Sequence, residues 1–228
     1  MSEQLKRIQS KIKQLRQLDK NLTLFGSNRH KYNLNPKLSE DTLLKFETAH
    51  NITLPKDYKE FLTKIGNGGV GPAYGLETFE NGLFDDLDYK RPNSLLNPSK
   101  PFPHTKPWNE EFISTVNEED NEEEYERQYS EFSKDLMNGV LAISNFGCGI
   151  SLNLVVNGEE YGNIWTDDRG NDGGIYPSDE LGNKDRITFL NWYELWLDNS
   201  INEIKEKVEN KHVEIKNTER KPWWKFGK

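Results

Sequence analysis

Apolar residues recur at intervals of three and four positions in several stretches of the chain, which is the pattern of helices that bury one face. The first of these stretches covers residues 3–19. A second begins after Ser39, whose side chain suits the N-cap position of a helix. A third covers residues 55–65, and a fourth follows Thr188. The pattern therefore predicts a helix in each of these stretches.

Two residues mark the boundaries of the third helix. Pro55 suits the first helical position, because its φ is fixed at a helical value and its missing N–H would be unpaired there. Gly66 is placed to end the helix in a left-handed conformation. A glycine-rich turn at 67–72 then precedes a short predicted strand at 74–76.

Beyond residue 139 the apolar period changes to two, which predicts strands. The first strand is predicted at 140–144 and the second at 152–156. Asn157-Gly158 indicates a tight hairpin turn, since both central residues of such a turn need positive φ, and the returning strand is predicted at 161–166. Hairpin-connected strands without alternating helices favour an α+β domain with an antiparallel sheet over a doubly wound sheet.

A long segment between the helices and the strands lacks a regular apolar pattern. Residues 81–108 contain five prolines and are too long for a plain connection in a compact domain. An acidic run at 117–126 follows and leads into a predicted helix that ends near Gly139. We therefore expect an acidic insertion at about 81–138 that crosses the surface of the domain.

The chain as a whole is predicted to have three parts. Residues 1–38 form a basic N-terminal helical extension, residues 39–208 form the main domain with its insertion, and residues 209–228 form a basic, aromatic tail. The tail combines cations with large rings, as at Trp223 and Phe226. Such a run can dock on a partner or fold back over its own core, and the sequence leaves both open.

Composition places the chain among globular proteins. Of its 228 residues, 33% are hydrophobic and 11% are aromatic, and aromatic residues are scarce in disordered chains. No stretch approaches the ~18 apolar residues that a membrane span needs, and the first residues lack the apolar core of a signal peptide. With Cys148 as the only cysteine, no disulfide within the chain can form. We expect a cytoplasmic protein.

Charge is unevenly distributed within a formal net charge of -8. Residues 1–38 contain nine Lys/Arg and two acids, whereas residues 109–135 contain eleven acids and two Lys/Arg. Such a separation can steer a partner electrostatically, and it also fits a basic helix packed on an acidic one or two solvated faces. The basic face of the first helix carries no aromatic residues on which bases stack, so we expect no direct binding of nucleic acid.

Three motifs suggest a chemical function, but the residues or elements around each of them do not fit that function. Residues 66–71 match the dinucleotide fingerprint G-x-G-x-x-G, but a helix precedes them and a strand follows, which is the reverse of what phosphate binding needs. The loop at 167–173 resembles a calcium loop, but Gly170 stands where an oxygen ligand is required. Cys148 has no active-site signature around it, and the four histidines are scattered. We therefore expect no catalytic residues, no metal and no cofactor.

Several segments taken together resemble the SUKH superfamily, which includes the Smi/Knr-type proteins. The most specific is Leu-Pro-Lys-Asp-Tyr-Lys-Glu-Phe-Leu at 54–62, which runs into the glycine-rich turn and Tyr-Gly-Leu at 74–76. The strand pair at 141–156, Tyr-Gly-Asn-Ile-Trp at 161–165 and the closing helix at 189–197 are less specific. The resemblance spans about residues 39–200.

The resemblance implies an α+β fold in which helices pack against an antiparallel sheet, and it implies no enzymatic activity. It also implies a protein-binding role, because bacterial members are mostly immunity proteins that bind and neutralise a polymorphic toxin, often a nuclease. Fungal members imply an alternative, a regulatory scaffold in cell-wall assembly. A small-ligand binder with the glycine-rich loop as its mouth is a third interpretation.

The acidic excess favours a basic partner, since complementary fields speed the encounter of two proteins. We therefore predict that a basic, cognate toxin domain is the partner. The predicted acidic contacts are Glu77, Glu80, Asp85, Asp86, Asp167, Asp168 and Asp172. Tyr74 and Trp165 are the predicted anchors, because large aromatic residues dominate binding hot spots. The structural alternative for each residue is that the rings lie in the core and the acids are simply solvated.

Overall fold

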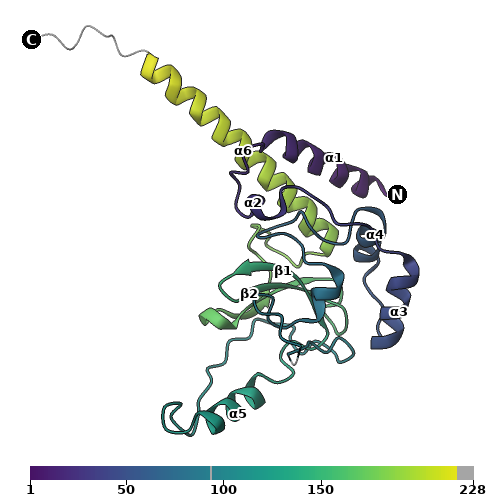
Figure 1. Ribbon diagram of the computed structural model, residues 1–228, viewed down its shortest axis with the longest axis vertical. Helices are drawn as coiled ribbons and strands as arrows, with labels where there is room; N and C mark the ends of the chain where they lie inside the picture. Colours follow the sequence, from purple (N-terminus) through teal and green to yellow (C-terminus); the bar gives the residue numbers. More distant parts are fainter. Residues whose placement is uncertain (93, 220–228) are drawn as a thin grey trace, which may run out of the picture.

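The computed structural model describes residues 1–92 and 94–219, with side chains described as far as Asn210 (Figure 1). Residues 220–228, which include Trp223 and Phe226 of the predicted tail, lie outside the described residues. Within the described part the elements are, in order, α1 (Glu3–Leu18), α2 (Ser27–His30), α3 (Glu40–His50), α4 (Lys56–Lys64), the 3₁₀ helix η1 (Phe79–Leu83), α5 (Glu122–Ser133), β1 (Val140–Gly147), β2 (Ile150–Val155), β3 (Ile164–Asp168), the 3₁₀ helix η2 (Arg169–Asn171), β4 (Gly174–Pro177) and α6 (Phe189–Glu219).

The strands form one antiparallel sheet in the order β1-β2-β3-β4, so that neighbours in sequence are neighbours in the sheet. In this register Leu152 of β2 lies opposite both Ser144 of β1 and Thr166 of β3. The strand predicted at 74–76 is reduced to isolated bridges of Leu76, one to Gly69 and one to Ser144 of β1. The prediction of an α+β fold with an antiparallel sheet and an N-terminal helix is confirmed.

The tight hairpin turn of the sheet joins β1 to β2 at Cys148 and Gly149. Their φ angles are 54° and 77°, as a two-residue hairpin turn with positive φ at both central positions requires. Asn157-Gly158, the predicted tight turn, lies instead in the longer connection between β2 and β3. Gly158 serves close packing there, because a Cβ atom on it would lie 2.9 Å from the backbone nitrogen of Phe102.

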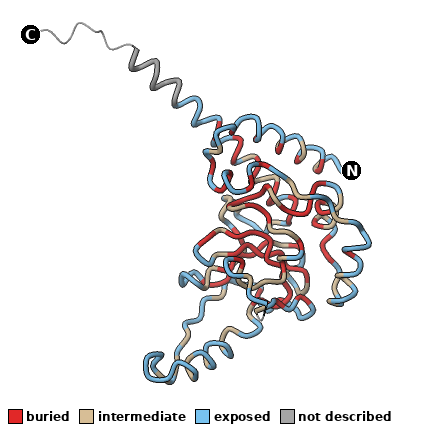
Figure 2. The backbone as a smooth tube through the Cα atoms, viewed as in Figure 1, coloured by how far each residue is buried: buried red, intermediate tan, exposed pale blue. Residues whose placement is uncertain are grey.

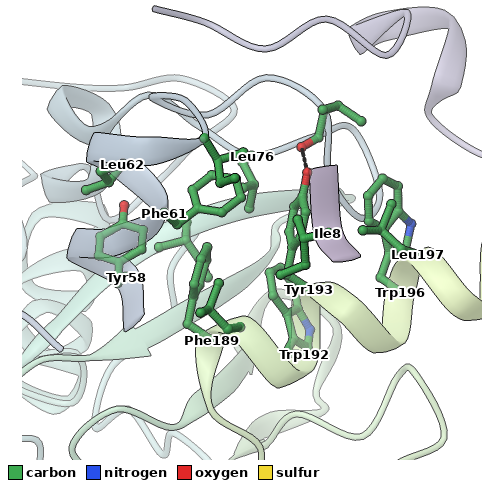
Figure 3. Close-up of a cluster of buried hydrophobic side chains, with 14 of the residues drawn as sticks. Ile8, Tyr58, Phe61, Leu62, Leu76, Phe189, Trp192, Tyr193, Trp196 and Leu197 are labelled. Atoms are coloured by element: carbon green, nitrogen blue, oxygen red, sulfur yellow. Dashed lines mark hydrogen bonds between the residues drawn. The ribbon is translucent and has the colours of Figure 1, made fainter. Parts of the chain in front are cut away.

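Helices cover one face of the sheet, and the main core lies between the two layers (Figures 1 and 3). The ring of Phe61 from α4 lies 5.2 Å from that of Phe189 and 4.8 Å from that of Tyr193, both from α6. The Tyr193 hydroxyl donates a hydrogen bond of 2.7 Å to the carbonyl oxygen of Val70, which Figure 3 marks with a dashed line. Burying a side chain of this size stabilises a fold by about 1.5–3 kcal/mol, so these rings hold α4 against α6.

α1 lies along α6 and runs parallel to it. Arg7 pairs with Glu194 at 2.9 Å, and Lys11 pairs with Asp198 at 2.7 Å; both pairs are 187 positions apart in sequence. The basic face of α1 therefore meets acids of α6 rather than the acidic segment at 109–135. The apolar face of α1 enters the main core through four buried residues, Leu5, Ile8, Ile12 and Leu15.

The other face of the sheet carries a second, smaller core. Its strand residues are Val140, Ala142, Val155, Trp165 and Ile175, and its cover includes Leu87, Leu96, Phe102 and Met137 from the insertion. The insertion at about 81–138 therefore does more than cross the surface, since it closes this face of the sheet. α5 has no buried residue and extends from the body of the molecule (Figures 1 and 2).

Both ends of α4 differ by a small amount from the prediction. Pro55 is the N-cap, one position before the first helical residue. Ile65 closes the helix, and Gly66 is not among the residues with positive φ. Gly66 is needed for a different reason, because a Cβ atom on it would lie 2.8 Å from the carbonyl oxygen of Asn35.

Candidate functional site

A pocket of about 470 Å³ opens beside the β1–β2 turn. Its walls come from the insertion, the turn itself, α5 and the junction of β3 with η2. Three of the predicted contacts, Asp85, Asp86 and Asp167, are among its lining residues. Its charged side chains are these three together with Asp88 and Arg169, so the pocket is acidic.

Arg169 is shared by two of the carboxylates. Its Nη2 lies 2.7 Å from Oδ2 of Asp167 and 3.6 Å from Oδ1 of Asp85. Burial lowers the pKa of Arg169, but the hydrogen bond to Asp167 and the two nearby negative charges raise that pKa by more, so the guanidinium stays protonated. Burial raises the pKa of Asp85 and outweighs the opposing attraction of Arg169.

Asp86 and Asp88 are held in fixed positions at the pocket. Oδ1 of Asp86 accepts hydrogen bonds from the backbone N–H groups of Asp88 and Tyr89, at 2.8 and 3.1 Å. Asp88 accepts one of 2.6 Å from the side-chain amide of Asn145 and one of 3.3 Å from the backbone N–H of Gly149. Neither carboxylate forms an ion pair with a described residue, so both contribute negative charge that is not neutralised within this part of the chain.

Asp88 and Asn145 are absent from the contacts predicted from sequence. They are 57 positions apart, and their contact depends on how the insertion lies against the β1–β2 turn. The close spacing of Asp85, Asp86 and Asp88 in an otherwise irregular segment is the sequence feature that points to this loop.

An aromatic cluster built around Tyr74 lies next to the β1–β2 turn, where a Cβ atom on Gly147 would lie 2.8 Å from the Tyr74 ring. The ring of Phe25 lies 5.4 Å from that of Tyr74 and 5.8 Å from that of Phe146. The guanidinium of Arg29 lies 5.0 Å from the centre of the Tyr74 ring. Tyr74 is half-buried, whereas Phe25 and Arg29 are exposed. We call these four residues the aromatic patch.

Trp165 lies in the second core rather than on the surface. Its side chain is fully buried, and its Nε1 donates a hydrogen bond of 3.2 Å to Glu160. The guanidinium of Arg186 covers the ring at 5.3 Å. The prediction of Trp165 as a surface anchor is therefore corrected, because the insertion covers the sheet face on which it stands.

The remaining predicted acids lie in two places. Asp168 and Asp172 flank η2, beside the pocket but outside its lining. Glu77 pairs with Lys90 at 3.3 Å, and Glu80 is exposed in η1. The structure thus brings one group of the predicted acids to the pocket and leaves Glu77 and Glu80 apart from it.

Other kinds of site have little support in the described part of the chain. It contains no group of three or more His, Cys, Asp or Glu side chains placed to hold a metal ion. The glycine-rich turn after α4 is filled by the chain itself, since a Cβ atom on Gly69 would lie 2.3 Å from the carbonyl oxygen of Asn33. Cys148 is exposed, and the residues that line the pocket with it include no histidine. Among the described helices none has the length and apolar character to cross a membrane.

Comparison of the sequence with known proteins identifies the family to which the sheet and the pocket belong. The SMI1/KNR4 family (SUKH-1) matches residues 37–178. No curated protein and no solved structure matches the chain. The family match covers more than half of the sequence and includes the whole sheet and every residue of the pocket. The expected resemblance is confirmed, and the chain belongs to the SMI1/KNR4 family (SUKH-1).

Proposed function

We propose that this chain is an immunity protein that binds a toxin protein domain and neutralises it by direct contact. The acidic pocket beside the β1–β2 turn carries the proposal, because hydrogen bonds fix Asp86 and Asp88 there without neutralising them. Membership of the SUKH-1 family supports a protein partner, since members of this family bind cognate toxins.

The charge of the pocket argues for a basic partner. Carboxylates that are already fixed lose little freedom on binding, so more of their attraction for cations remains as affinity. Tyr129 of α5 lines the same pocket, which places the acidic segment at 109–135 next to it. A nuclease toxin fits this field, because surfaces that bind nucleic acid are rich in Lys and Arg.

Neutralisation in this proposal requires occupation of the toxin surface and no chemistry on this chain. The proposed function therefore uses no catalytic residue, metal or cofactor. We place the binding in the cytoplasm, a reducing compartment in which the free thiol of Cys148 is stable.

Co-expression tests the proposal. The toxin domain encoded by the neighbouring gene is produced alone and together with this chain, and bacterial growth and co-purification are measured. We expect growth to be restored and a complex to be recovered. Absence of both results would contradict the proposal, and a complex without restored growth would favour the regulatory scaffold instead.

A matched pair of variants tests the pocket itself. Asp86→Asn removes one charge but keeps an oxygen that accepts from the backbone N–H groups of Asp88 and Tyr89. We expect at least about tenfold weaker binding of the toxin domain at low salt. Asp41→Asn removes the same charge from α3, where the side chain is 69% exposed and paired with Lys45. Equal losses in the two variants would show that net charge matters and the pocket does not.

A further inference from the structure

Phe25 is the most exposed ring of the aromatic patch, with 60% of its surface open to water. Its neighbours Tyr74 and Phe146 are half-buried, so the three rings form one apolar area with Phe25 projecting from it. Exposed groups of apolar side chains mark interaction surfaces more often than isolated ones do. The main core and the second core are both complete without Phe25.

The loop that carries Phe25 is firmly held. Asp19 accepts hydrogen bonds from the backbone N–H groups of Thr23 and Leu24, at 2.7 and 3.2 Å. Gly26 follows Phe25 with a φ of 72°, and a Cβ atom on it would lie 1.6 Å from the carbonyl oxygen of Ala73. Phe25 is therefore fixed between two anchored segments, and a partner that covers it loses little affinity to the ordering of a loop.

Asn145 connects the aromatic patch to the acidic pocket. Its carbonyl oxygen accepts a hydrogen bond of 3.2 Å from the backbone N–H of Tyr74, and its side-chain amide donates to Asp88 in the pocket. Phe146, the next residue of β1, belongs to the patch. The two features thus meet at the same end of β1, where buried Asn145 is hydrogen-bonded to both.

We propose that the aromatic patch is the apolar anchor of the toxin-binding surface, and that its occupant is an apolar depression on the toxin bordered by Lys or Arg side chains that reach the acidic pocket. This inference rests on the proposed function. Charge complementarity supports the choice of occupant, because the pocket presents four aspartates whereas the patch carries the single cation Arg29. A second copy of this chain fits less well, since a twofold contact at this surface brings one acidic pocket close to the other.

The patch joins residues from two parts of the sequence. Tyr74 and Phe146 lie inside the family match at 37–178, whereas Phe25 and Arg29 precede it. The N-terminal segment therefore adds to a surface that the matched region provides. In this arrangement Phe25 selects among toxins, while the pocket supplies attraction for any basic partner.

Three variants and two measurements test the inference. Phe25→Ala removes the anchor, Phe25→Tyr keeps the ring, and Leu44→Ala removes an apolar side chain of similar exposure, 61%, from α3. Affinity for the toxin domain of the neighbouring gene is measured by calorimetry, and self-association is measured by sedimentation velocity. Thermal melting of each variant checks that it remains folded.

We expect Phe25→Ala to weaken binding by about 30-fold or more, as removal of a central aromatic anchor does, while Phe25→Tyr and Leu44→Ala stay within about threefold of the wild type. If the wild type binds the toxin domain and Phe25→Ala binds it with the same affinity, this inference is overturned and the proposed function stands. If the wild type self-associates and Phe25→Ala abolishes this self-association, the occupant of the patch is a second copy of the chain, and this inference is overturned as well. No binding by the wild type would overturn both proposals.

Discussion

The side-chain amide of Asn145 donates a hydrogen bond of 2.6 Å to Oδ1 of Asp88. Oδ1 of Asn145 accepts one of 2.6 Å from the backbone N–H of Gly147, and the residue is buried. Because its carbonyl oxygen also accepts from Tyr74, Asn145 holds the pocket, the β1–β2 turn and the aromatic patch in one arrangement.

Asn145→Ala is expected to lower the free energy of unfolding by about 2 kcal/mol, since it leaves the N–H of buried Gly147 without a partner and removes the hydrogen bond to exposed Asp88. Urea denaturation measures the change. Asn199→Ala is the control, because this exposed amide donates to the carbonyl oxygen of Leu181 at 2.9 Å, and we expect a loss below about 0.5 kcal/mol. Equal losses in the two variants would contradict the role given to Asn145.

The β1–β2 turn makes a prediction about Cys148, an exposed residue with a φ of 54°. Asn adopts this left-handed conformation more readily than other non-glycine residues do, whereas a β-branched residue is strained in it. We expect Cys148→Asn to stabilise the fold by about 0.5 kcal/mol and Cys148→Val to destabilise it by about 1–2 kcal/mol. Urea denaturation measures both changes. Equal denaturation midpoints for Cys148→Asn and Cys148→Val would contradict this turn geometry.

The pairing of α1 with α6 predicts a pH dependence that Glu194 controls. Hydrogen bonds from Arg7 and Lys11, together with their positive charges, lower the pKa of Glu194 to about 2 against the effect of burial. A carboxyl whose pKa is lower in the folded state contributes stability above its ordinary pKa of 4.5 and loses it as the pH falls toward 2. We expect Glu194→Gln to lower the free energy of unfolding by about 1 kcal/mol at pH 7 and by little at pH 2.5.

Urea denaturation of the wild type and of Glu194→Gln at pH 7 and pH 2.5 measures this pH dependence. Glu3→Gln is the control, because Glu3 forms an i,i+3 pair with Lys6 in which its side chain is 80% exposed. We expect that variant to match the wild type within about 0.5 kcal/mol at either pH. A Glu194→Gln loss that persists unchanged at pH 2.5 would show that packing, and not charge, is responsible.

His30 predicts a second pH dependence, in a higher range. Burial lowers the pKa of His30 to about 4, against the attraction of Asp19. As the pH falls from 6.5 toward 4, the unfolded chain takes up a proton that the folded chain does not, so stability present above pH 6.5 is lost in this window.

We expect the titration of His30 to lower the free energy of unfolding of the wild type by about 1–2 kcal/mol between pH 7 and pH 5. His30→Asn keeps an acceptor for the backbone N–H of Tyr32, which bonds to Nδ1 at 3.0 Å, and it is expected to show a flatter dependence. Direct titration of the His30 ring by NMR supplies an independent check, and a midpoint near the ordinary value of 6.5 would refute the argument.

Helix positions were predictable where local features agree. The helix predicted at 3–19 is α1, and Ser39 caps α3 by accepting a hydrogen bond of 3.1 Å from the backbone N–H of Thr42. The antiparallel sheet also follows from the period of two and the absence of helices between the strands. These features depend on residues within a few positions of one another, which the sequence shows directly.

Contacts between distant segments were not predictable in the same way. The role of Gly66 depends on Asn35, and the burial of Trp165 depends on an insertion that has no regular pattern. In the candidate site, charge points to Asp85, Asp86 and Asp167, whereas the contact between Asp88 and Asn145 joins residues 57 positions apart and leaves no pattern in the sequence. Exposed Phe25 carries no feature in the sequence that separates it from a core residue.

α1 precedes the residues that match the family, and α6 follows them. Yet both helices place fully buried side chains in the main core, among them Leu5, Ile8, Trp192 and Tyr193. A fragment cut at residues 37 and 178 would expose that face of the sheet to water. The stretch that matches the family is therefore shorter than the stretch that folds as one unit, because α1 and α6, on either side of the match, complete its main core.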